Sequence, residues 1–82
     1  MFKYISRKDS KQFTDGKQCH VITMVCATYH NYEVTTVVYH NIEVISISLN
    51  QHVFEPKDFD FVAAMLWYSN KEAMLNDLVA LL

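Results

Sequence analysis

The feature that most constrains this chain is a short motif that occurs twice, with a β-branched run after each copy. Residues 29–34 read YHNYEV, and ten residues later residues 39–44 read YHNIEV. The runs that follow are TTVV and ISIS. His and Asn tolerate left-handed backbone angles better than most residues, and apolar or β-branched runs on both sides of such a pair indicate a hairpin. We therefore predict two successive two-residue turns, at His30-Asn31 and His40-Asn41.

Asp15-Gly16 is a third predicted turn, because this pair is typical of the type I′ turns of hairpins. With these turns the strands cover residues 18–29, 32–39 and 42–49, preceded by an irregular segment that starts at residues 3–7 and continues to 14. Whether residues 2–14 form a strand stays open, because residues 6–11 lack apolar alternation. The sequence thus predicts an antiparallel meander of three to four strands.

Two-residue turns also determine which side chains share a face of the sheet. In the expected register one face is nearly all apolar or β-branched, so we expect helices to cover it. Its members are Val21, Thr23, Val25, Ala27, Tyr29, Tyr32, Val34, Thr36, Val38, Ile45, Ile47 and Leu49. The opposite face has a polar end and an apolar end, and the apolar end consists of Ile22, Met24, Val37, Tyr39, Ile42 and Val44.

The last third of the chain has helical periodicity. Pro56 suits a first helical turn, and Asp58 and Asp60 stand where the helix dipole favours acids. Residues 59–68 are apolar almost all round, so we expect this helix to be buried on more than one side. Residues 69–72, SNKE, resemble a capping box with Ser69 as the N-cap, which predicts a break near Ser69 and a second helix over 70–82.

Together these elements predict one α+β domain over residues 1–82, with the helices packed on one face of the sheet. Its parts are a basic N-terminal arm or edge strand over 1–17, a β-meander over 18–49, and one kinked helix or two helices over 57–82. A chain of this length supports one modest core. It has more apolar surface than such a core can hide, and exposed apolar patches mark interfaces.

We therefore expect the surplus apolar surface to form contacts with a partner, most simply with a second copy in a homodimer. The expected contact residues are Leu78, Val79, Leu81 and Leu82 near the end of the chain, and Met24, Val37, Tyr39 and Val44 on the sheet. The alternative is that this surface docks onto a different protein.

Charge is unevenly distributed along the chain. Residues 1–20 carry a net charge of +3, whereas residues 21–82 carry −5. Aromatic side chains alternate with the basic ones of the arm, and the candidate contact residues there are Lys3, Arg7, Lys8 and Lys11. Three interpretations of this basic arm stay open: an edge strand protected by lysines, a contact with an acidic protein, and single-stranded nucleic-acid binding. The acidic body argues against a broad nucleic-acid footprint.

The residues that carry chemistry form no catalytic constellation, so we expect a protein that is not an enzyme and uses no cofactor. A single glycine, Gly16, rules out glycine-rich phosphate loops and nucleophile elbows. Cys19, His20 and His40 are weak metal-ligand candidates, because adjacent strand residues point to opposite faces and no fourth ligand is evident. Cys26 has no basic neighbour in sequence and reads as an inert buried thiol.

The sequence thus favours a small, non-catalytic module that binds and regulates, for example inhibits, another protein. Two cysteines too far apart along one strand to pair suit a reducing compartment, so we expect a cytoplasmic protein. The longest uncharged apolar run, residues 61–70, is too short to insert in a membrane. Many virus-encoded modulators of host proteins are small domains of this kind, an analogy of size alone.

Overall fold

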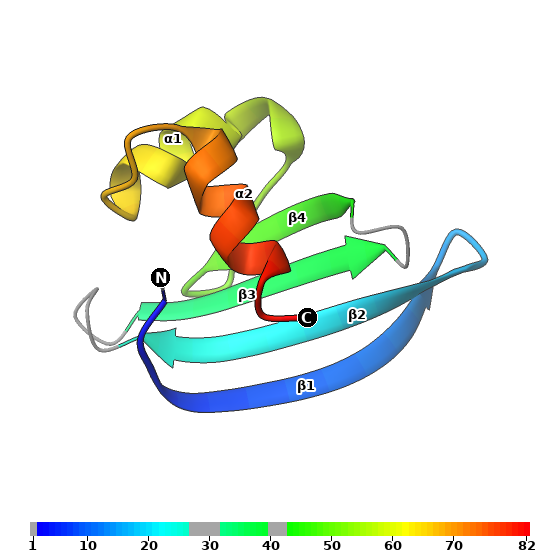
Figure 1. Ribbon diagram of the computed structural model, residues 1–82. Helices are drawn as coiled ribbons and strands as arrows, with labels where there is room; N and C mark the ends of the chain where they lie inside the picture. Colours follow the sequence, from blue (N-terminus) through cyan, green and yellow to red (C-terminus); the bar gives the residue numbers. More distant parts are fainter. Residues whose placement is uncertain (1, 27–31, 40–42) are drawn as a thin grey trace.

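The computed structural model describes residues 2–26, 32–39 and 43–82, and it has the α+β fold that the sequence predicts. Its strands are antiparallel and lie in the order β1-β2-β3-β4-β5, so each pairs with its neighbours in sequence. The helices lie together on one face of this sheet (Figure 1). The elements are β1 (Tyr4–Thr14), β2 (Lys17–Cys26), β3 (Tyr32–Tyr39), β4 (Val44–Leu49), β5 (His52–Phe54), a 3₁₀ turn at Pro56–Asp58, α1 (Phe59–Met65) and α2 (Lys71–Val79).

The hairpin between β1 and β2 confirms the turn predicted at Asp15-Gly16. The φ angles of these residues are 53° and 76°, and Thr14 pairs with Lys17 across the turn. Two successive positive φ angles are typical of the type I′ turn, whose twist matches that of the strands. The doubtful first segment is a strand of 11 residues, with one irregularity in its pairing, between Tyr4 and Ser6.

The register between β2 and β3 differs from the prediction by three residues. A two-residue turn at His30-Asn31 would pair Ile22 with Tyr39, whereas Ile22 pairs with Thr36. Five residues separate the paired Cys26 and Tyr32, so the connection is longer than predicted; the predicted turn itself lies outside the described residues. Because three is an odd number, this shift moves every side chain of β2 to the other face relative to β3.

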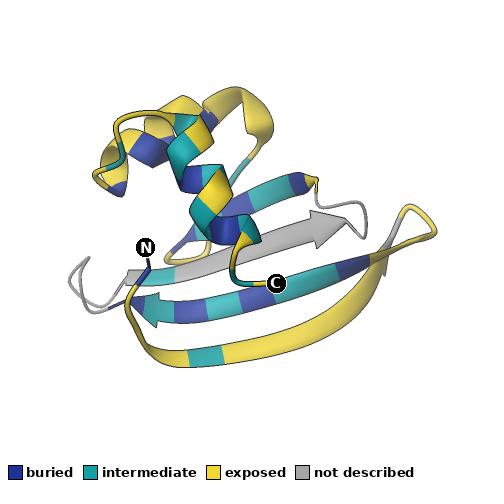
Figure 2. Ribbon diagram, in the orientation of Figure 1, coloured by how far each residue is buried: buried dark blue, intermediate teal, exposed yellow. Residues whose placement is uncertain are grey.

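The predicted assignment of faces in β2 is therefore wrong. Ile22, Met24 and Cys26 are completely buried beneath the helices, whereas the alternating residues Val21, Thr23 and Val25 are only half-buried on the opposite, open face. The dark and teal segments of β2 in Figure 2 show this alternation. In β2, the side chains that were expected to need a cover are thus the ones that the helices leave open.

From Val34 to Val37 the register between β3 and β4 differs from the prediction by two residues, which keeps the predicted faces. Thr36 pairs with Ile47 where a two-residue turn would pair it with Ile45, and the pairing shifts again at Val38, which faces Val44. Ile47 and Leu49 therefore remain on one face, as predicted, and both are buried in the core. The shift at Val38 instead brings Val44 to the helix-covered face, so the face predicted for Val44 is wrong. The turn predicted at His40-Asn41 lies outside the described residues.

One apolar core fills the space between the sheet and the helices. Full burial of one large apolar side chain contributes roughly 1.5–3 kcal/mol. The sheet supplies Ile22, Met24, Cys26, Val44, Ile47 and Leu49, the helical region supplies Phe59, Val62, Ala63, Leu66, Met74 and Leu78, and Phe2 joins them from the N-terminal segment. No helix in the described part of the chain combines the length and the apolar character that crossing a bilayer requires.

The helical region contains the break that the sequence predicts, but the capping residue is different. Pro56 opens the 3₁₀ turn that leads into α1, and α1 ends at Met65. The N-cap of α2 is Asn70, whose side-chain oxygen accepts a hydrogen bond from the Ala73 N–H at 2.8 Å. The capping role predicted for Ser69 is therefore wrong by one residue. Asn is an equally strong N-cap residue, so the chemistry of the motif did not decide between them.

The burial of α2 can be tested by truncating one leucine within the helix and one beyond its end. Leu78 is completely buried, whereas Leu82, just beyond the helix, is 46% exposed. Leu78→Ala should lower the free energy of unfolding by about 3 kcal/mol, because it leaves a cavity in the core, while Leu82→Ala should change it by less than about 0.5 kcal/mol. Urea denaturation measures both, and equal effects would contradict the observed packing of α2.

The position of the N-cap gives a second matched pair. Asn70→Ala removes the acceptor of the Ala73 N–H and should cost about 1 kcal/mol of stability. Ser69→Ala, the neighbouring exposed position, should cost less than about 0.3 kcal/mol, because Ser69 caps nothing. Thermal denaturation of the two variants distinguishes the two candidate caps. A larger loss of stability for Ser69→Ala would contradict Asn70 as the N-cap and support Ser69.

Candidate functional site

A short hairpin that the sequence analysis missed places two rings at the far edge of the sheet. β4 and β5 are joined by Asn50-Gln51, with φ angles of 50° and 71°, and Leu49 pairs with His52. The Asn50 side chain accepts a hydrogen bond from the Glu33 N–H, and the Asn50 N–H donates to the Glu33 carbonyl, both at 2.9 Å. This anchored turn brings His52 and Phe54 alongside β4. The only sequence signal is Asn50, which tolerates positive φ.

The rings of β5 continue onto α1 and line a shallow apolar groove. The ring centroids of His52 and Phe54 are 4.7 Å apart, and those of Phe54 and Phe61 are 5.8 Å apart. The groove encloses about 300 Å³ between the β4–β5 hairpin and α1, and we call it the aromatic groove. Its lining residues are Leu49, Asn50, His52, Phe54, Phe61 and Met65.

The prediction that the first helix is buried on more than one side is wrong. α1 buries Phe59, Val62 and Ala63 against the core, but Phe61 is 57% exposed and Met65 37%. The exposed positions of α1 appear as yellow bands on the upper helix in Figure 2. An ordinary surface helix carries polar residues on its solvent side. Here that side presents Phe61 and Met65, and the exposed Trp67 follows just after the end of the helix. We call these three residues together the outer face of α1.

Trp67 stands at a backbone position that usually belongs to glycine. The Trp67 N–H donates to the Ala64 carbonyl at 3.1 Å, and the Tyr68 N–H donates to the Ala63 carbonyl at 2.9 Å. This pair of hydrogen bonds is the Schellman motif, and its left-handed residue is Trp67, with a φ of 62°. A side chain at such a φ costs about 1 kcal/mol relative to glycine. The side chain that occupies this position is also 67% exposed.

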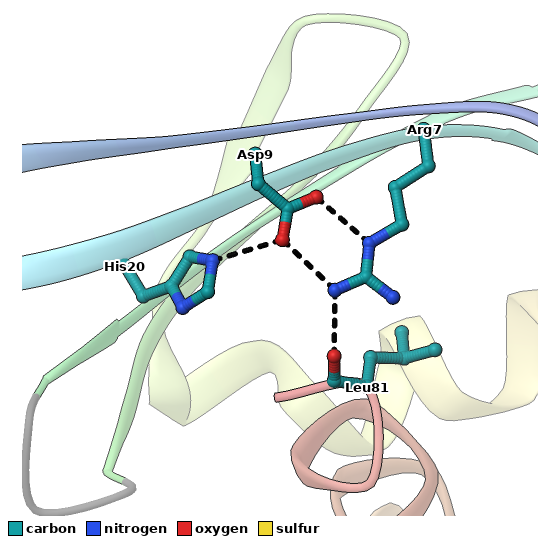
Figure 3. Close-up of polar contacts among 4 residues, drawn as sticks. All are labelled: Arg7, Asp9, His20 and Leu81. Atoms are coloured by element: carbon teal, nitrogen blue, oxygen red, sulfur yellow. Dashed lines mark hydrogen bonds and ion pairs between the residues drawn. The ribbon is translucent and has the colours of Figure 1, made fainter.

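The basic arm contributes an internal anchor. The Arg7 guanidinium holds the Asp9 carboxylate with two hydrogen bonds, of 2.7 and 2.9 Å, and donates to the Leu81 carbonyl at 2.6 Å (Figure 3). His20 Nε2 contacts Asp9 Oδ2, the oxygen that also accepts from Arg7 Nη2, at 3.0 Å. The guanidinium, with a smaller contribution from His20 and against the opposing effect of burial, lowers the pKa of Asp9 to about 2. This network ties β1 and β2 to the end of the chain.

Arg7 is therefore a structural residue, although the sequence analysis proposed it as a partner contact. Phe2, one of the aromatic residues of the arm, is also buried in the core, and its ring contacts the tilted ring of Tyr68 with 5.7 Å between the centroids. Lys3, Lys8 and Lys11 are exposed, and none of the ion pairs in the described part of the chain involves them. These lysines remain candidates for contact with a partner.

Three of the eight predicted interface residues lie inside the protomer. Met24 and Leu78 are completely buried and Val44 is buried in the same core, so the expectation that these three are surplus surface is wrong. The reversed face of β2 explains Met24, and the docking of α2 on the sheet explains Leu78. Val79 and Leu81 are half-buried against the core, Leu82 is exposed, and the side chains of Val37 and Tyr39 are not among those described.

The predicted metal ligands do not converge on one site in the described part of the chain. Among the described residues no group of three His, Cys, Asp or Glu side chains could hold a metal ion, and His40 lies outside them. His20 points to Asp9, whereas Cys19 is buried and donates weakly to the Lys17 carbonyl. Cys26 is completely buried, as predicted, and burial raises the pKa of its thiol, which favours the protonated form.

Comparisons of this chain with protein-family models, with curated proteins and with solved structures find no significant match. Two surfaces of the described structure carry exposed apolar or charged side chains. One is the outer face of α1 with the aromatic groove beside it. The other is β1, at the opposite edge of the sheet, with its exposed lysines.

The role of Asp9 predicts a pH dependence of stability. Folding lowers the pKa of Asp9 from 3.8 to about 2, so its contacts stabilise the protein above pH 3.8 and are lost as the pH falls toward 2. Asp9→Asn should lower the free energy of unfolding at pH 7 by no more than about 1 kcal/mol, because the side chain is 38% exposed and solvent screens it.

Urea denaturation at pH 7 and at about pH 2.5 measures this difference. The gap between the wild type and Asp9→Asn should shrink at the lower pH, where the wild-type carboxyl begins to take up its proton. Asp15→Asn is the matched control, because Asn suits the left-handed turn position as well as Asp does. A gap that is the same at both pH values would contradict the role assigned to Asp9.

Proposed function

We propose that this chain is a non-catalytic protein-binding module that regulates a partner protein and that pairs with a second copy of itself through the outer face of α1. The observation that carries the proposal is Trp67: a large aromatic side chain, 67% exposed, at a backbone position where glycine would be less strained. Strained positions persist where a function needs them, and exposed aromatic residues anchor protein interfaces.

The aromatic groove supports the same surface. Phe61 and Met65 border the groove from α1, and Phe54, whose ring contacts that of Phe61, borders it from β5, so a side chain of the partner would lie against a continuous apolar surface. Interface hot spots are typically aromatic anchors that enter such apolar pockets. In a symmetric dimer the exposed aromatic side chain of each copy could contact the aromatic groove of the other copy.

The size of the molecule is compatible with this arrangement. A standard interface covers about 800 Å² on each partner. The whole protomer exposes 5186 Å², so such an interface would occupy about one sixth of its surface. Phe61, Met65 and Trp67 would form its centre, with the polar residues around them as the rim.

Other parts of the proposal follow from residues already described. Both cysteines are free and buried, which supports a reducing, cytoplasmic setting. The buried thiol of Cys26 and the absence of a converging ligand set among the described residues support a non-catalytic role. Arg7 donates a hydrogen bond within the protomer and Phe2 is buried in its core, so neither supports single-stranded nucleic-acid binding by the arm.

Replacing Trp67 by glycine separates binding from folding. Trp67→Gly relieves the positive-φ strain, so the stability of the monomer should stay within about 1 kcal/mol of the wild type. The variant loses the aromatic anchor, so the dimer dissociation constant should rise about thirtyfold, which corresponds to about 2 kcal/mol. Light scattering over a range of protein concentrations measures the mass, and urea denaturation of dilute protein measures the monomer.

Phe13→Ser is the matched control, because Phe13 is also exposed (76%) but does not belong to the outer face of α1. It lies on β1, the edge strand of the sheet opposite β5. This variant should dimerise like the wild type. A wild-type protein that is monomeric at all concentrations would contradict the dimer, and a Trp67→Gly variant that dimerises normally would contradict the surface assigned to it.

A further inference from the structure

We infer that β1 is a second docking site, which accepts an extended acidic segment of a partner protein as an additional strand of the sheet. β1 is the outermost strand of the described sheet and pairs only with β2. Alternate residues of an edge strand direct their N–H and C=O groups away from the sheet, where they are available to another chain. β1 is exposed along almost its whole length (Figure 2).

The geometry of β1 suits the addition of a strand. Its pairing with β2 is regular from Ser6 to Thr14, and the register shift next to Ile5 lies near one end. Proteins often protect long edges with proline or with bulges along the strand. β1 contains no proline, since Pro56 is the only one in the chain. The opposite edge, β5, has only three residues and offers far fewer groups.

The positive charge of β1 indicates which kind of segment would bind there. The Asp9 carboxylate is neutralised by Arg7, which leaves Lys8 and Lys11 in the strand and Lys3 just before it as exposed charges outside any described ion pair. Two β1 edges brought together would place these lysines against their own copies, which is unfavourable. An acidic segment would pair with the same lysines. The lysines thus exclude a second copy and attract a partner of opposite charge.

The spacing of the lysines specifies the partner more closely. Lys8 pairs with Thr23 on the open face of the sheet, whereas Lys11 pairs with His20 on the helix-covered face. An odd separation along a strand always places two side chains on opposite faces. A partner segment that pairs with both lysines therefore needs two acidic residues three positions apart, one for each face.

Exposed apolar side chains extend the contact at both ends of the strand. Ile5 is 66% exposed and Phe13 is 76% exposed. A strand that served only to block aggregation would have no use for them, whereas cross-strand pairs of apolar and aromatic residues stabilise an added strand. The proposed segment is thus acidic in its middle and apolar or β-branched around the acids.

A synthetic peptide tests the inference. The probe is fluorescently labelled Thr-Val-Glu-Thr-Val-Glu-Thr-Val, about the length of a typical strand, with its two acids three positions apart. We expect fluorescence anisotropy to show saturable binding to the full chain, and the protein's backbone amides of residues 6–14 to exchange more slowly with solvent in the complex. An isomer with its two glutamates two positions apart should bind several-fold more weakly.

Two comparisons decide between strand addition and simple attraction of charge. A version of the probe N-methylated at alternate residues keeps its charges but loses backbone donors, and it should bind at least tenfold more weakly. Lys8→Glu/Lys11→Glu should weaken the unmethylated probe at least tenfold. Lys57→Glu/Lys71→Glu makes the same change in net charge away from β1 and should leave binding within twofold.

Several results would overturn the inference: no binding of the probe, equal binding of its methylated version, or equal binding to both double variants. Edge-to-edge pairing of β1 in two copies, seen as a mass that Lys8→Glu/Lys11→Glu changes, would also overturn it. So would tight, steeply salt-dependent binding of oligothymidylate at the same lysines. Trp67→Gly should bind the probe normally, so this site and the outer face of α1 can fail independently.

Discussion

The pairing of Ile22 with Thr36 decides which side of β2 faces the helices, and the rest of the core follows from it. Ile22, Met24 and Cys26 meet Ile47 of β4 on the same face, and together they form an apolar floor on which α1 and α2 pack. A register one residue different would bring Val21, Thr23 and Val25 to that floor. The helices would then cover smaller side chains, and the larger ones would face solvent.

The helices are too short to cover more than part of this sheet. α1 and α2 have 7 and 9 residues, which correspond to about 10 and 14 Å of helix. β1, with 11 residues, extends over about 33 Å along the strand. The helices therefore pack over the middle strands and leave two features at opposite ends of the sheet: the exposed edge of β1 and the outer face of α1 beside β5 (Figure 1). Both proposed docking sites result from this incomplete coverage.

The sequence was sufficient for features that depend on local chemistry. Asp15-Gly16 specifies a type I′ turn by itself, and the break before α2 follows from a run of polar residues. The register of β2 could not be derived, because it depends on the length of a connection and both faces of the strand are apolar enough to be buried. The outer face of α1 was missed for a related reason. Residues such as Phe61 look like core residues in sequence, and only the placement of the helix shows that they face outward.

Trp67 is the only tryptophan in the chain, so its fluorescence reports directly on the surface to which we assign the interaction. The most direct measurement is therefore its emission spectrum and its quenching by iodide as the concentration of the wild-type protein rises. If the outer face of α1 pairs with a second copy, the emission will shift to shorter wavelength and iodide will quench it less at high concentration. An emission spectrum and a quenching constant that stay those of an exposed indole at every concentration would contradict the account.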